Sequence, residues 1–228
     1  MEYRICGRTG IEVSEVGLGC EHLEGMAYQP IQSVIDTALD QGINLLDVFM
    51  SEPEVRSNIG KALHGKREKA VIQGHLCSVW MHGQYGRNRE MKNVQFFFED
   101  LLRRLQTDYI DFGMLHLVDT DADLKKVLEG DIMEYAQKLK QNGTIRAIGL
   151  SSHNPVIAQK AVESGLIDVL LFSLNPAYDI LPEDMPLSGL FTRESYRQQG
   201  LNGTNPVRAS LYQSCEAMGT GITVMKGQ

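Results

Sequence analysis

Side chains that can exchange protons lie at similar positions along this 228-residue sequence, at or just after the ends of short apolar segments. Asp47, His75 and His116 each stand at the end of such a segment, and Glu52 follows five residues after Asp47. Two carboxylates and two imidazoles are suited to acid–base catalysis near neutral pH. The same set also has the chemistry of a Zn²⁺, Mn²⁺ or Fe²⁺ site. The sequence therefore predicts acid–base or metal chemistry for these four residues.

Other polar residues follow the ends of the same kind of segment. A lone histidine is more often a structural residue than a functional one. Several histidines at the ends of such segments, which would lie at one edge of a parallel sheet, together favour a functional site. Three groups of residues fit this description: Cys20, Glu21 and His22 after the first segment, Ser151, Ser152 and His153 at the fifth, and Lys226 at the last.

The elements that must position these residues alternate strictly along the chain. Short apolar segments, which predict strands, alternate with amphipathic segments of helical periodicity. This alternation is typical of a parallel sheet covered by helices. The expected strands are 15–20, 43–48, 70–76, 109–116, 145–152, 168–174 and 221–226. The expected helices are 31–41, 54–64, 93–106, 122–141, one beginning at Pro155, and 207–218.

Two parallel-sheet architectures fit this alternation, an open doubly wound sheet and a closed barrel. Segments 70–76 and 168–174 are apolar on both faces, which both architectures require. Gly17 and Gly19 do not begin a G-x-G-x-x-G motif, which weakly disfavours the open sheet. These residues by themselves leave both the open sheet and the closed barrel as candidates. Such a barrel has its site at the carboxyl ends of its strands.

Composition excludes several classes of function. The net charge is −7, and no basic block is present, which argues against nucleic acid or an anionic membrane surface as a partner. No apolar run approaches the 18 or so residues that a membrane-spanning helix needs. The chain also starts without the apolar segment of a signal peptide. Its four cysteines are scattered, which favours free thiols and a cytoplasmic location.

Five segments together resemble the aldo-keto reductase family, and the likeness covers nearly the whole chain. The last of them resembles the seventh strand in a subgroup that often ends in an iron–sulfur segment. The likeness implies an α/β fold of the (β/α)8 TIM-barrel type, one domain over residues 1–228, with only about seven β/α units present. By this likeness the chain lacks the eighth strand and its flanking helices, and we expect it to be C-terminally truncated. The segments are YRICGRTGIEVSEVGLGC at 3–20, INLLDV at 43–48, DYIDFGMLH at 108–116, IRAIGLSSHN at 145–154 and CEAMGTGITVMK at 215–226.

The resemblance implies NADPH-dependent reduction of a small aldehyde or ketone by an aspartate, a tyrosine, a lysine and a histidine. Asp47 matches the family's aspartate and His116 its histidine. The tyrosine's place falls on Glu52 and the lysine's on His75. A glutamate is normally ionised at pH 7, so Glu52 would be a poor proton donor, and His116 is the expected substitute.

The resemblance also implies residues that bind the nicotinamide cofactor. The family's Ser-Asn turn reads Ser151-Ser152 here, and its strand-six glutamine falls on Leu171. The expected cofactor-binding residues are Gly19, Cys20, Glu21, Asp47, Ser151, Ser152 and Lys226.

Two other functions stay open. A metal-dependent barrel enzyme would use Asp47, Glu52, His75 and His116, and a non-catalytic family member would explain the lost tyrosine. Trp80 and Tyr85, in the loop after the third strand, either line a substrate pocket or pack that loop onto the barrel. The long segment 176–206 is a candidate lid.

Overall fold

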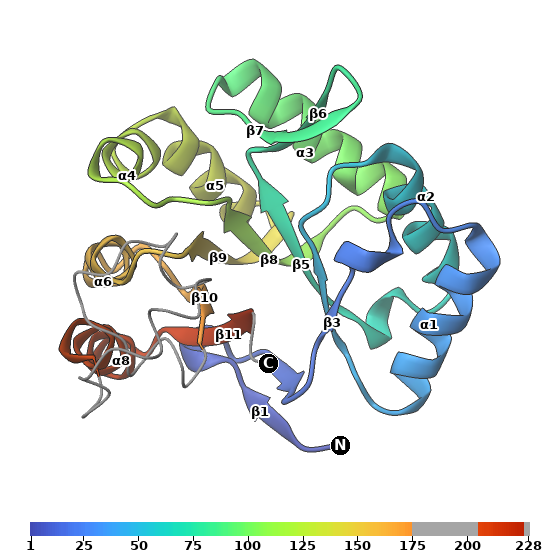
Figure 1. Cartoon of the computed structure of the whole chain (residues 1–228), viewed down its shortest axis with the longest axis horizontal. Helices are drawn as coiled ribbons and strands as arrows, with labels where there is room; N and C mark the ends of the chain where they lie inside the picture. The colour runs from blue at the N-terminus through green and yellow to red at the C-terminus, as the bar shows by residue number, and fades with distance from the viewer. Residues whose placement is uncertain (175–204, 226–228) are drawn as a thin grey trace, which may run out of the picture.

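A single curved sheet of seven parallel strands forms the centre of the protein (Figure 1). The computed structural model describes residues 1–174 and 205–225. The strand order is β11-β10-β9-β8-β5-β4-β3, so β3 and β11 form the two edges of the described sheet. The strands are β3 (Leu18–Gly19), β4 (Leu45–Val48), β5 (Val71–Leu76), β8 (Ile110–Leu115), β9 (Ile145–Ser152), β10 (Val169–Ser173) and β11 (Gly221–Met225).

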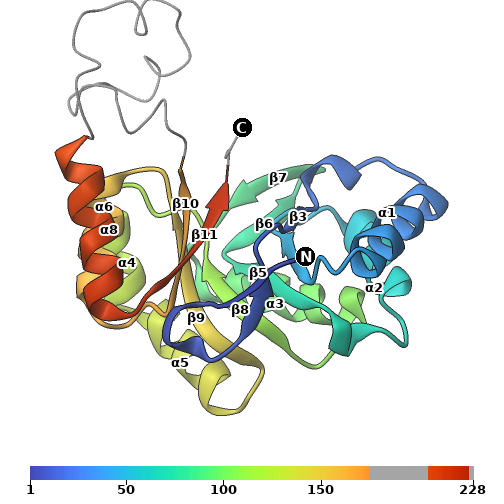
Figure 2. The same ribbon diagram turned by 90° about the horizontal axis from the view of Figure 1, so that it is seen from below.

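Helices follow the strands and cover the outer face of the sheet (Figures 1 and 2). Their apolar stripes pack on the strands, and the core between them includes Ile35, Phe98 and Ala136, all nearly inaccessible to solvent. The predicted fold class, a barrel with about seven β/α units, is confirmed. The helices are α1 (Tyr28–Asp40), α2 (Pro53–Ala62), α3 (Met91–Leu105), α4 (Asp121–Leu128), α5 (Asp131–Gln141), α6 (Pro155–Glu163) and α8 (Pro206–Met218).

The prediction of one helix over 122–141 is wrong, because α4 ends at Leu128 and α5 begins at Asp131. Gly130 separates them in an extended conformation, with φ −124° and ψ −172°. A Cβ atom at Gly130 would lie 2.8 Å from the carbonyl oxygen of Lys126, so this close turn requires glycine.

The segment after β5 forms a hairpin where the sequence predicted only a polar loop. Strands β6 (Ser78–Met81) and β7 (Gln84–Arg87) pair antiparallel, with Trp80 opposite Tyr85. His82 and Gly83 connect them, and both have positive φ, 55° and 75°. This is the signature of a two-residue type I′ turn, whose twist matches that of a hairpin.

A second hairpin at the N-terminus packs against the beginning of the last described strand. It pairs β1 (Tyr3–Ile5) with β2 (Glu12–Ser14). Arg8, in the turn between them, donates its backbone N–H to the carbonyl oxygen of Gly219 at 2.7 Å, just before β11. Most of the candidate lid, residues 176–204, and one expected cofactor ligand, Lys226, lie outside the described residues. Within the described part of the chain, no helix is long and apolar enough to cross a membrane.

Asp168 ties several elements together at the amino end of β10. Its Oδ2 accepts the backbone N–H of Ile148 at 2.9 Å and the ammonium of Lys140 at 2.5 Å. Its Oδ1 accepts Nε of Arg8 at 3.0 Å. Burial raises the pKa of Asp168, but hydrogen bonds from Lys140 and Ile148 and from Arg8 outweigh this and lower it below its usual value. The ionised carboxylate is therefore the form that stabilises the fold.

We expect Asp168→Asn to lower the free energy of unfolding at pH 7 by about 3 kcal/mol, because it leaves two cations without their carboxylate. The wild-type advantage is present above the unfolded-state pKa of about 3.9 and is lost as pH falls through the lower folded-state pKa. Urea unfolding at pH 7 and pH 3 measures both effects. Asp121→Asn, which removes an exposed pair with Lys160, is the matched control; an equal loss in both variants would contradict this role for Asp168.

Candidate active site

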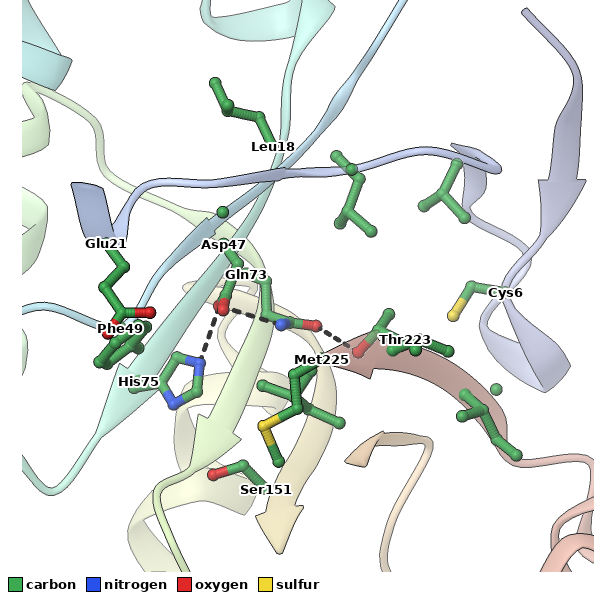
Figure 3. A pocket seen from close by; sticks show the side chains of 18 of the residues that line it. Cys6, Leu18, Glu21, Asp47, Phe49, Gln73, His75, Ser151, Thr223 and Met225 are labelled. Atoms are coloured by element: carbon green, nitrogen blue, oxygen red, sulfur yellow. Dashed lines mark hydrogen bonds and ion pairs between the residues drawn. The ribbon is translucent and has the colours of Figure 1, made fainter. Parts of the chain in front are cut away.

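A cavity of about 1120 Å³ lies inside the curve of the sheet (Figure 3). Residues of the N-terminal hairpin, β3 and β11 line it, together with inward-facing side chains of the central strands. At its polar end the cavity meets Asp47, His75 and His116, from β4, β5 and the residue after β8. These strands are neighbours in the sheet, and the parallel arrangement brings their carboxyl ends to one rim.

The three residues form a hydrogen-bonded chain. Oδ1 of Asp47 lies 3.0 Å from Nε2 of His75, and Nδ1 of His75 lies 2.8 Å from Nδ1 of His116. His75 is 2% exposed and His116 5%, so water cannot easily replace either contact. The structure thus brings together three of the four residues predicted to be catalytic.

Tyr85 extends this chain from the β6–β7 hairpin. Its hydroxyl is within hydrogen-bonding distance of Nε2 of His116. Its ring lies edge-on to Phe49, with centroids 5.8 Å apart, and Phe49 stacks on the ring of His116 at 6.1 Å. The ring of Tyr85 is 38% exposed and lines the cavity. Of the two residues for which pocket lining or loop packing was expected, Tyr85 lines the cavity and Trp80 is not among its lining residues.

The surroundings favour neutral forms for the outer two members of the chain. Burial, together with His75 and the guanidinium groups of Arg87 and Arg89, lowers the pKa of His116 well below 6.5. Burial, together with the charge of Glu21, raises the pKa of Tyr85 to about 12. At neutral pH His116 is therefore an uncharged imidazole and Tyr85 a protonated phenol.

Asp47 is also fixed from the opposite side of the cavity. Nε2 of Gln73 donates to Oδ1 of Asp47 at 3.0 Å, and the hydroxyl of Thr223 in β11 donates to Oε1 of Gln73 at 2.9 Å (Figure 3). Oδ1 of Asp47 thus contacts both Gln73 and His75, which fixes the orientation of the carboxylate.

Glu52 does not join this cluster, contrary to the prediction. It precedes α2 as its N-cap, and its two carboxylate oxygens accept the backbone N–H groups of Glu54 at 2.9 Å and Val55 at 2.5 Å. Pro53 at the first helical position completes a strong helix start. The helix N-terminus holds this carboxylate because it satisfies two otherwise unpaired donors.

The alternative metal site is not assembled either. With Glu52 held at the helix, Asp47, His75 and His116 remain, and the two imidazoles face each other through Nδ1. In the part of the chain that the structure describes, no group of three or more His, Cys, Asp and Glu side chains is placed to hold a metal ion.

The residues expected to bind cofactor are divided between the cavity and its surroundings. Gly19, Glu21 and Ser151 line the cavity together with Asp47. Cys20 is not among the lining residues; it is 1% exposed, and burial raises the pKa of its thiol.

Ser152 also faces away from the cavity. Its hydroxyl donates to Oδ1 of Asp119 at 2.9 Å, and the backbone N–H of His153 donates to the same oxygen at 2.7 Å. Burial raises the pKa of Asp119, but hydrogen bonds from His153 and Ser152 lower it below its usual value. Ser152 therefore supports the loop after β9 and does not line the cavity.

Residues 15–200 match the aldo/keto reductase family, and the chain belongs to that family. The aldo-keto reductase YhdN of Bacillus subtilis is 29% identical over 202 residues, which cover 83% of this chain and 57% of that protein. The uncharacterized oxidoreductase YqkF of Bacillus subtilis is 30% identical over 194 residues, with coverage of 82% and 60%. This chain thus spans less than two thirds of the length of either relative.

The fold has a close counterpart among solved structures. The holo form of the aldo-keto reductase AKR11C1 from Bacillus halodurans superposes with a TM-score of 0.74 at 24% identity, covering 98% of this chain and 65% of that one. The likeness supports the barrel fold. Membership of the iron–sulfur-tailed subgroup stays a prediction, because the family match does not distinguish that subgroup.

Glu52→Ala should lower the free energy of unfolding by about 1 kcal/mol, because α2 loses the acceptor for two N–H groups. Glu54→Ala, in the exposed first turn of the same helix, should cost a few tenths of a kcal/mol through the helix dipole alone. Urea unfolding of both variants measures the difference. Equal effects would contradict the capping role.

Proposed function

We propose that this protein interconverts a small aldehyde or ketone and its alcohol with a nicotinamide cofactor, NADPH by preference, in the cavity at the carboxyl ends of β4, β5 and β8. Family membership supports the reaction class. The observation that carries the proposal is the buried hydrogen-bonded chain of Asp47, His75 and His116, which ends at the cavity. Reduction of a carbonyl group needs a proton donor beside the carbonyl oxygen. These three hydrogen-bonded side chains can deliver the proton.

The described lining fits the nicotinamide end of the cofactor. Phe49, Leu171 and Met225 give it apolar surface. The Oγ of Ser151 accepts the backbone N–H of Leu117 at 2.8 Å, so its own hydrogen is free to donate to an amide oxygen in the cavity. Bound NADPH would supply the hydride that reduces the carbonyl carbon.

The charged end of the cofactor needs cations that the described lining supplies sparsely. Arg4 is the only Lys or Arg among the described lining residues, and it pairs with Glu15. Ser151 and the apolar residues of the lining would therefore contact the nicotinamide.

A nicotinamide without its adenosine half is the direct probe of this assignment. Reduced nicotinamide mononucleotide should bind saturably to the wild-type protein, and NADPH should bind more tightly. A fluorescence titration with each compound measures both affinities. Absence of binding by either compound to protein with an intact circular-dichroism spectrum would contradict the proposal and favour a non-catalytic family member.

Gly19 offers a way to block the cavity without strain. A Cβ at this residue meets no atom within 4 Å, and Gly19 lines the cavity from β3. Gly19→Leu should weaken binding of both compounds at least about tenfold, which corresponds to about 1.4 kcal/mol, because the side chain occupies ligand space. Gly19→Ala, which adds one carbon, is the matched control. Wild-type affinity in Gly19→Leu would show that the compounds bind elsewhere.

A further inference from the structure

The chain lacks a tyrosine at the place where its family carries one, yet a phenol reaches the same cluster from another element. Tyr85 lies in β7, 33 residues after Glu52 in the sequence, and its hydroxyl meets Nε2 of His116.

The hairpin is fixed to both sides of the cluster. On the β4 side, the hydroxyl of Ser78 donates to the carbonyl oxygen of Phe49 at 2.6 Å, and that of Ser51 donates to the carbonyl oxygen of Val79 at 2.6 Å. On the β8 side, Arg89 donates to the carbonyl oxygen of His116 at 2.7 Å. The position of Tyr85 is thereby set relative to both strands that carry its neighbours.

The two Nδ1 atoms, 2.8 Å apart, must share one proton, which allows two arrangements. With His75 neutral, His75 donates from Nε2 to Asp47, His116 donates from Nδ1 to His75, and the phenol of Tyr85 donates to Nε2 of His116. In the second arrangement His75 is protonated beside the carboxylate of Asp47. The hydrogen bond between His75 and His116 and the one between His116 and Tyr85 then both change direction. Nε2 of His116 then donates to the oxygen of Tyr85, and the phenol proton is free to point into the cavity.

We propose that Tyr85 is the catalytic residue that exchanges a proton with the substrate oxygen, and that His116, His75 and Asp47 form a relay that returns the proton to it. This inference rests on the proposed function. It requires the phenol to be reachable by substrate, and the 38% exposure of Tyr85 at the cavity meets that requirement.

The proton transfers balance in the direction of reduction. As the carbonyl carbon receives a hydride, the π electron pair of the C=O bond moves to the oxygen, which takes the phenol proton of Tyr85. The phenolate takes the Nε2 proton of His116, and Nδ1 of His116 takes the Nδ1 proton of protonated His75. His75 ends neutral, with its remaining proton on Nε2 toward Asp47 and its vacant Nδ1 toward His116. After the alcohol leaves, a proton from water in the cavity enters at the hydroxyl of Tyr85, the Tyr85 proton moves to Nε2 of His116, and the Nδ1 proton of His116 moves to Nδ1 of His75, which restores the protonated form. Alcohol oxidation runs the same transfers in reverse.

The charges around the relay favour this order. The lowered pKa of His116, which Arg87, Arg89 and His153 reinforce, keeps the positive charge off that ring. His75 is the ring that contacts the carboxylate of Asp47, at 3.0 Å, so the proposed relay places the charge there. The raised pKa of Tyr85, with Glu21 and Asp47 facing it, keeps the phenol protonated between turnovers.

Tyr85→Phe should lower kcat for carbonyl reduction at least about 100-fold, which is the usual contribution of a positioned acid, and leave the affinity for NADPH within about twofold. Trp80→Phe, which changes the cross-strand neighbour of Tyr85 outside the cavity lining, should keep wild-type kcat and controls for the hairpin. Wild-type kcat in Tyr85→Phe would overturn the role of Tyr85 and leave the proposed function intact. No turnover by the wild-type protein on a panel of aldehydes and ketones would overturn the proposed function and this role together.

A second measurement needs no turnover, and its first part uses the wild-type protein alone. In wild-type protein with ¹⁵N-labelled histidine, Nε2 of His116 should show a hydrogen-bonded resonance. In Tyr85→Phe that resonance should move, while those of the exposed rings of His64 and His82 stay in place. An Nε2 resonance of His116 without a hydrogen bond in the wild-type protein would overturn the relay.

Discussion

The contact between the Nδ1 atoms of His75 and His116 is the constraint from which the rest of the site follows. Two protons between these nitrogens would repel and none would leave two lone pairs facing each other, so one proton must lie there. Asp47 accepts from Nε2 of His75 wherever that proton resides, whereas the direction of the hydrogen bond between His116 and Tyr85 depends on which ring holds it. The site therefore has two defined states that differ by one proton, as a residue that both gives and takes protons requires.

This arrangement enables a tyrosine to donate its proton in a different way from the family pattern. In the pattern that the family resemblance implies, a lysine makes a neighbouring tyrosine more acidic. Here His75 stands in the lysine's place, and the pKa of Tyr85 is raised to about 12, mainly by burial. Tyr85 therefore cannot act through a permanently acidified phenol. Tyr85 can act only if it receives a proton from His116 as its own proton leaves. The two imidazoles of His116 and His75 provide the path for that proton.

The sequence predicted the scaffold well because apolar periodicity and strand ends are local signals. Asp47, His75 and His116 were found in this way, since neighbouring parallel strands end at one rim. Glu52 was misplaced because alignment with a family position ignored its local chemistry: Glu52-Pro53 also reads as an N-cap followed by a first-turn proline, the signal that correctly marked Asn154-Pro155.

The sequence left two roles open for Tyr85. Its partner His116 is 31 residues away, and their contact depends on how a hairpin folds over two strands. The turn at His82-Gly83 was a usable signal, because adjacent residues with positive φ are typical of a tight hairpin. Given that hairpin, side chains alternate, and Tyr85 falls on a defined face. What the sequence does not contain is the angle between hairpin and sheet, which Ser51, Ser78 and Arg89 fix through backbone carbonyls. Because those anchors lie on the segments after β4 and β8 and in the hairpin, the acid–base half of the site depends on the centre of the sheet. Hydrogen bonds from Thr223 through Gln73 tie it to β11, the edge strand of the described sheet.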